Sequence, residues 1–145
     1  MDESAYHGAR QLINPTPCVL ERAILAGYAN CELSRRKALA EREVITCSSQ
    51  VARINCSTLQ SLFVERAKFA LRLPRQGAPL AYAKAMKLQC GGLRGLQTAL
   101  AAPELNVHAM VQEAMHDQAS LLDLPWDAIV ASIAAWQLRK RATSP

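Results

Sequence analysis

Apolar residues recur every three or four positions through most of this chain, and no alternating apolar and polar run is long enough to compete. That spacing is typical of an α-helix with one buried face, whereas a half-buried strand alternates at every second residue. The sequence therefore predicts an all-α fold, a compact single-domain bundle of about six helices spanning residues 1–145. The clearest stripe consists of Leu59, Leu62, Phe63, Phe69, Ala70 and Leu73.

Prolines and charged runs divide this helical pattern into segments. Pro15 and Pro17 favour a helix that opens near Cys18, because a proline in the first turn loses no internal hydrogen bond. The charge-rich stretch 32–43 is expected to be a solvated helix with some ion pairing. Residues 74–79 hold two prolines and a glycine, which predicts a connector between two helical halves. Residues 1–16 are expected to form a flexible N-terminal segment.

The composition favours a cytoplasmic protein without membrane insertion. Half of the 145 residues are hydrophobic, enough for a core that needs no covalent staples. No run of about 18 apolar residues occurs, and the first three residues, Met1, Asp2 and Glu3, lack the apolar core of a secretion signal. No phosphate-binding loop or hydrolase motif is present, so an enzyme is less expected than an electron carrier, a sensor or an adaptor.

Five cysteines are the residues most suited to chemistry beyond a folded core. Their spacing lacks the short paired motif of zinc ribbons and redox disulfides, and an odd number cannot pair completely within one chain. A reducing cytoplasm also argues against disulfides. Buried inert thiols, metal or iron–sulfur ligands, and a thiol switch remain as alternatives. The cysteines are Cys18, Cys31, Cys47, Cys56 and Cys90.

Helical periodicity places Cys31, Cys47 and Cys90 on inward stripes. Cys47 and Cys56 would lie on opposite sides of one unbroken helix, so a helix break is predicted near residues 55–57. The preferred ligand set is Cys31, Cys47, Cys56 and Cys90, with Cys18 as the alternative fourth ligand.

The two glycines after Cys90 favour its place in this set. Gly91 and Gly92 would let the backbone approach a bulky cluster, although a glycine pair is also an ordinary helix end. Cys18 has a separate argument, because the free N–H groups of a helix start favour a thiolate there.

Four thiolates suit an iron–sulfur cluster, expected to be of the 4Fe–4S type, because clusters accept widely spaced ligands. Structural zinc typically uses short cysteine pairs, so zinc is the second choice. We therefore expect a cluster-binding protein that acts in electron transfer or redox sensing. The alternative is a non-enzymatic adaptor whose cysteines are structural or hold zinc. Nucleic acid is one partner that such an adaptor could bind.

The net charge of +5 points to an acidic partner. The expected docking cations are Arg35, Arg36, Lys37 and Arg42, on the charged helix predicted at 32–43; with Arg94, the first three would also tune a cluster's potential. Nucleic acid is a less expected partner, because aromatic residues for base stacking are few and no helix-turn-helix pattern is clear.

Overall fold

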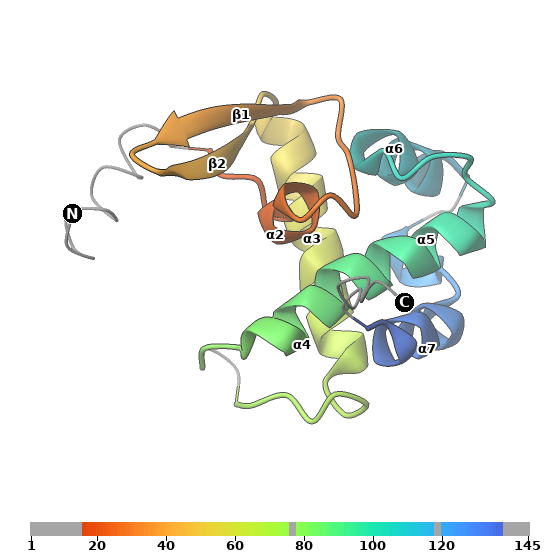
Figure 1. The fold of residues 1–145 in the computed structure, drawn as a ribbon. Coiled ribbons are helices and arrows are strands. Elements are labelled where there is room, and N and C mark those ends of the chain that lie inside the picture. Colours follow the sequence, from red (N-terminus) through yellow and green to blue (C-terminus); the bar gives the residue numbers. More distant parts are fainter. Residues whose placement is uncertain (1–15, 76–77, 118–119, 138–145) are drawn as a thin grey trace, which may run out of the picture.

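The computed structural model describes residues 16–75, 78–117 and 120–137. The predicted flexible segment 1–16 therefore lies, except for Thr16, outside the described residues. Figure 1 shows a small β-hairpin at one end of a long helix, α3, which the later helices cross and cover.

The hairpin contradicts the all-α prediction. Strand β1 (Ser34–Leu39) pairs antiparallel with β2 (Arg42–Cys47), and Ser34 lies opposite Cys47. The charged helix predicted over 32–43 is therefore wrong, and so is the all-α class: the described part of the chain is a mixed α and β fold.

The hairpin turn explains why the sequence pattern failed here. Only Ala40 and Glu41 separate the strands, and Ala40 takes the left-handed backbone conformation with φ of 57°. Two-residue hairpin turns usually carry Asn-Gly or Asp-Gly at these positions, and neither is present. The β-branched run of Val44, Ile45 and Thr46 is the remaining strand signal.

Two helices flank the hairpin in sequence. Helix α2 (Glu21–Leu25) is short and is followed by Gly27, whose φ of 83° ends the helical path before Cys31. Helix α3 (Gln50–Ala67) begins at Ser49, whose side-chain oxygen accepts the Ala52 N–H at 3.2 Å. The predicted break at residues 55–57 is wrong, since the chain changes from strand to helix at Ser48 and Ser49 instead.

The second half of the described chain is helical. Segment 74–79 lies between α3 and a continuous helical run made of α4 (Tyr82–Met86), the π-helical turn η1 (Lys87–Gly91) and α5 (Gly92–Leu100). Helix α6 (Val107–Asp117), the short η2 (Leu121–Asp123) and α7 (Trp126–Ala135) follow.

One main core joins these elements. Leu20, Ile45, Leu59, Phe63, Met86, Leu93, Met110 and Ile129 are among its fully buried members. A separate pair, Leu39 and Val44, is buried elsewhere on the hairpin. Ile45 thus anchors one face of the hairpin to the helices, which fixes the position of Cys47 two residues later on the same face.

Candidate functional site: a four-cysteine junction

Cys18 and Cys47 lie on neighbouring backbone segments. The chain at Thr16–Cys18 runs antiparallel beside β2: the Cys18 N–H donates to the Ile45 carbonyl and the Cys47 N–H donates to the Thr16 carbonyl, both at 2.9 Å. Residues directly opposite in such a pairing share a face, and so do residues two apart on a strand. Cys18 and Cys47 therefore lie on the face of Ile45, toward the core.

Cys31 lies near the end of β2 as well, but on the β1 side of the hairpin. Ser34 lies opposite Cys47, and both its N–H, at 3.1 Å, and its hydroxyl, at 2.7 Å, donate to the Cys31 carbonyl. The loop that carries Cys31 is thus folded back against the start of β1, beside the end of β2.

Cys56 joins the group from α3. It lies on the inward stripe of that helix between Ala52 and Leu59, both buried. One turn earlier, the Arg53 guanidinium donates through Nε to the Pro17 carbonyl at 2.9 Å, which ties α3 to the segment of Cys18. Arg53 is a site residue that the sequence analysis missed, because only the tertiary pairing places it next to Pro17.

The thiols are close enough to influence one another's ionisation. The pKa of Cys56 is raised to about 12, mainly by burial and in smaller part by charge repulsion from the nearby Cys31, Cys18 and Cys47. Burial likewise raises the pKa of Cys18 to about 11, with smaller repulsion from Cys31 and Cys47, while a bond from the Leu20 N–H opposes the rise. Cys18, Cys31, Cys47 and Cys56 form what we call the four-cysteine junction.

Cys90 lies apart from this junction. It is buried in η1, and burial alone raises its pKa to about 11, without a contribution from another cysteine. The glycines after it pack against protein rather than opening space for a cluster. A Cβ on Gly91 would stand 2.7 Å from the Ile133 Cα, and one on Gly92 would stand 2.6 Å from the Phe63 ring. The glycine argument for Cys90 is therefore not supported.

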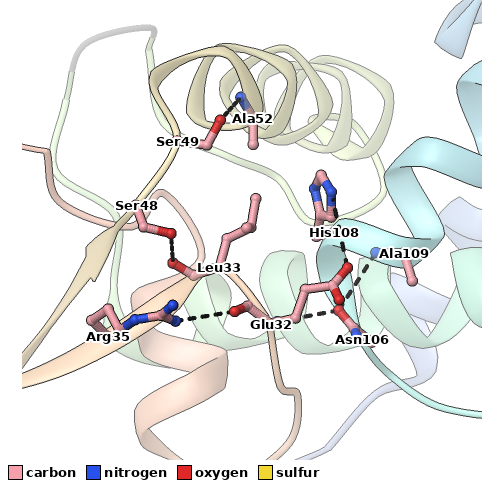
Figure 2. A network of polar contacts seen from close by, with 9 residues as sticks. All are labelled: Glu32, Leu33, Arg35, Ser48, Ser49, Ala52, Asn106, His108 and Ala109. Carbon is pink, nitrogen blue, oxygen red and sulfur yellow. Dashed lines mark hydrogen bonds and ion pairs between the residues drawn. The ribbon is translucent and has the colours of Figure 1, made fainter.

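A polar network fixes the loop that carries Cys31 beside the residues that follow Cys47 (Figure 2). The Ser48 hydroxyl donates to the Leu33 carbonyl at 2.7 Å, and the Arg35 guanidinium donates to the Glu32 carbonyl at 3.1 Å. Directly before α6, the Asn106 side-chain oxygen accepts the Glu32 N–H at 3.4 Å. The Cys31 loop is thus fixed to the end of β2 and to the start of α6.

The backbone strengthens this link between loop and helix. The Asn30 N–H donates to the Leu105 carbonyl at 2.9 Å, and the Val107 N–H donates to the Asn30 carbonyl at 2.8 Å. The residues on either side of Asn106 thus hold the loop before Cys31 against the start of α6.

As the side chains stand, no group of three or more Cys, His, Asp or Glu residues in the described ranges is arranged to hold one metal ion. The Cys47 thiol instead donates a hydrogen bond to the Ser49 carbonyl at 3.2 Å. A tetrahedral zinc with Zn–S bonds of about 2.3 Å needs its sulfurs within about 4 Å of one another. The thiols of the described residues are therefore not arranged as a preformed zinc site.

The cations predicted to dock a partner lie on the hairpin and not on a helix. Arg36 forms an ion pair with Glu43 at 2.9 Å and also donates to the Ile24 carbonyl, while Arg35 donates to the carbonyls of Glu32 and Ser34. Lys37 and Arg42 are exposed on the two strands. Arg94 lies on α5 and lines a different cavity, next to Trp136.

Comparison with known proteins yields no relative: no family model, curated protein or solved structure matches this chain. Among the described helices, none combines the length and the apolar character that crossing a bilayer requires.

Proposed function

We propose that the chain binds a 4Fe–4S cluster through Cys18, Cys31, Cys47 and Cys56, and acts in the cytoplasm in electron transfer or redox sensing rather than as a catalyst. The observation that carries this proposal is the convergence of four cysteines from four separate segments. An edge segment, a loop, a strand end and a helix face each supply one thiol. Cys18, the alternative fourth ligand of the sequence analysis, takes the place of Cys90.

The residues at the junction suit a buried anionic group. The Leu20 N–H donates to the Cys18 sulfur, and hydrogen bonds to ligand sulfurs are one of the means by which proteins tune cluster potentials. The core side of the junction is apolar, since Cys18, Cys31 and Cys56 all pack against the main core and so are partly screened from water. A bound cluster would supply one-electron redox chemistry, and its iron would favour the thiolate form of each ligand.

We prefer a cluster over a single zinc ion because the cysteines lack the short paired spacing that structural zinc sites typically use, whereas clusters accept widely spaced ligands. The thiols of the junction are near enough to influence one another's ionisation, as a shared group requires. A protein partner of acidic character completes the proposal, because an electron carrier or sensor must pass its signal on and this chain is basic.

The raised pKa values weigh against a simple thiol switch. Reactive cysteines have lowered pKa values, because the thiolate is the nucleophile. Cys18 and Cys56 have pKa values of about 11 and about 12, so in the metal-free chain both remain protonated and unreactive near neutral pH.

Anaerobic purification tests the cofactor directly. We expect brown protein, with iron and acid-labile sulfide at about four each per chain. Colourless protein with one zinc per chain would replace the cluster by a structural zinc site. Colourless, metal-free protein that is fully folded would show that the cysteines are core residues, as in the adaptor alternative.

Single replacements test the ligand set, with Cys90 as the matched control. Cys18→Ala, Cys31→Ala, Cys47→Ala and Cys56→Ala should each lose the cluster, because each leaves three thiolates without the fourth. Cys90→Ala should keep full iron content and lose only about 1 kcal/mol of stability. Loss of iron in Cys90→Ala, with iron kept in Cys18→Ala, would show that Cys90 is the fourth ligand in place of Cys18, as the sequence analysis preferred.

A further inference from the structure

The positive charge of this protein is concentrated far from the hairpin. Residues 65–87 contain six Lys and Arg and one acidic residue, so this segment alone has a net charge of +5, equal to that of the whole chain. The six cations are Arg66, Lys68, Arg72, Arg75, Lys84 and Lys87. The end of α3, the connection after it and α4 with the start of η1 thus form a cationic end of the molecule.

An apolar groove opens at this cationic end. It has a volume of about 810 Å³ and runs between the second half of α3 and residues 73–75 and 78–80. Leu62, Val64, Leu73 and Leu80 line it, together with Phe69, whose side chain is 84% exposed. Single exposed apolar residues are ordinary, but an exposed aromatic ring beside an apolar groove is typical of an interaction site.

Charged and polar groups border the groove in a definite arrangement. Lys68 and Arg75 line it, and Lys84 is held close to Arg72 because its Nζ donates to the Arg72 carbonyl at 2.9 Å. Glu65 is the acid on this wall, and it forms an ion pair with Lys68 at 2.8 Å. The Gln60 side chain also lines the groove, and its buried amide oxygen has no hydrogen-bond partner among the described residues.

We propose that this groove docks an acidic amphipathic helix of a partner protein, with the helix's apolar side chains beside Phe69 and its carboxylates near Lys68 and Arg75. Apolar faces of such helices bind in grooves, while opposite charges speed the encounter and set orientation. The concave apolar lining distinguishes this partner from a flat bilayer. Phe69 is the one aromatic residue among the described residues that line the groove, which offers little stacking for nucleic acid.

This surface is better suited to docking than the hairpin. Arg35 and Arg36 are engaged with backbone carbonyls, so their charges also maintain local structure. The groove shares no residue with the four-cysteine junction, and the docking proposal can therefore fail while the cluster proposal holds, or the reverse.

A random peptide display library tests the chemistry of the partner without presupposing it. The full-length, anaerobically purified chain is the bait. The enriched peptides should have net negative charge and at least two large apolar residues at helical spacing. A synthetic copy of the best peptide is then titrated by fluorescence anisotropy, and raising the salt from about 0.05 to about 0.5 M should weaken its binding.

Two double variants locate the site. Phe69→Ser with Arg75→Glu removes the exposed ring and reverses a groove charge, and should weaken the peptide at least about tenfold. Val51→Ser with Arg94→Glu makes the same kinds of change at a 71% exposed residue near the start of α3 and at a cation on α5. This control should bind like the parent, and circular dichroism checks that both variants fold.

Three results would overturn the proposal. They are enrichment of no peptide, enrichment of peptides that are not acidic, and binding that the groove variant leaves unchanged. Oligo(dT) and phosphatidylserine vesicles are titrated in parallel. If either binds more tightly than the peptide, and that binding is lost in the groove variant, the surface serves nucleic acid or a membrane instead.

Discussion

At the scale of single residues, Cys90 shows how burial alone sets the behaviour of a thiol. Its side chain is 3% exposed, and its pKa is raised to about 11 because the thiolate would lose its water in the core. In the unfolded chain the same thiol has an ordinary pKa near 9. Between about pH 9 and 11 the unfolded state therefore binds fewer protons than the folded state, and stability falls across that range.

Replacing Cys90 should remove this part of the alkaline loss of stability. We expect the parent chain to lose more unfolding free energy than Cys90→Ala between about pH 8 and pH 10, measured by urea denaturation. Other titrating groups affect both chains equally, so the difference isolates Cys90. Equal losses in the two chains would show that the Cys90 thiolate is tolerated in the folded state.

At the scale of elements, close packing of α5 and η1 against α7 depends on glycine. Gly91 and Gly95 are four residues apart, and a Cβ on either would stand 3.0 Å or less from the backbone of α7. The Ser132 hydroxyl also donates to the Gly91 carbonyl at 2.9 Å. The Cys90-Gly91-Gly92 sequence, attributed to a cluster on sequence grounds, is thus a helix-packing motif.

Gly91→Ala should therefore destabilise the protein by about 2 kcal/mol, because the added methyl meets backbone that cannot move aside cheaply. Gly27→Ala is the matched control. Gly27 has a φ of 83° and open space around it, so only backbone strain of about 1 kcal/mol is expected there. Urea denaturation measures the loss of unfolding free energy in each variant. A larger loss in Gly27→Ala than in Gly91→Ala would contradict the packing argument.

At the scale of the whole molecule, the junction depends on α6, a helix distant in sequence from every proposed ligand. Asn106 links them, since its side-chain oxygen accepts both the Ala109 N–H at the start of α6 and the Glu32 N–H beside Cys31 (Figure 2). Substitution of Asn106 should therefore weaken retention of the proposed cluster, although Asn106 is not itself a ligand.

Asn106→Ala should lower stability by about 1 kcal/mol and speed cluster loss to an iron chelator severalfold, because the Cys31 loop is less firmly held. Ser120→Ala is the control, since Ser120 accepts the Leu122 N–H at the start of η2 and, among the described residues, makes no hydrogen bond to the Cys31 loop. It should lose similar stability and release iron at the parent rate. Equal release from both variants would show that Asn106 supports only its helix.

The sequence by itself determined the features that depend only on residue type and on neighbouring residues, without a distant partner. The apolar stripes placed the later helices, where Asn106 precedes α6 and Pro125 precedes α7. It also marked the cysteines as the candidate site and offered Cys18 as a ligand. Each of these inferences depends on residue type or on spacing within one helix, and such signals survive in a one-dimensional pattern.

Only the tertiary structure decided the hairpin and the membership of the junction. Residues 34–47 carry charges that suit a solvated helix. They form strands instead, because Ile45 packs into the core and Thr16–Cys18 pairs with β2. Cys18 meets Cys47 and Cys56 through bonds between segments about 30 residues apart or more, and no local period encodes such pairings. Cys90 lies apart from the junction for the same reason, because its surroundings are set by the approach of α7 and not by its own helix.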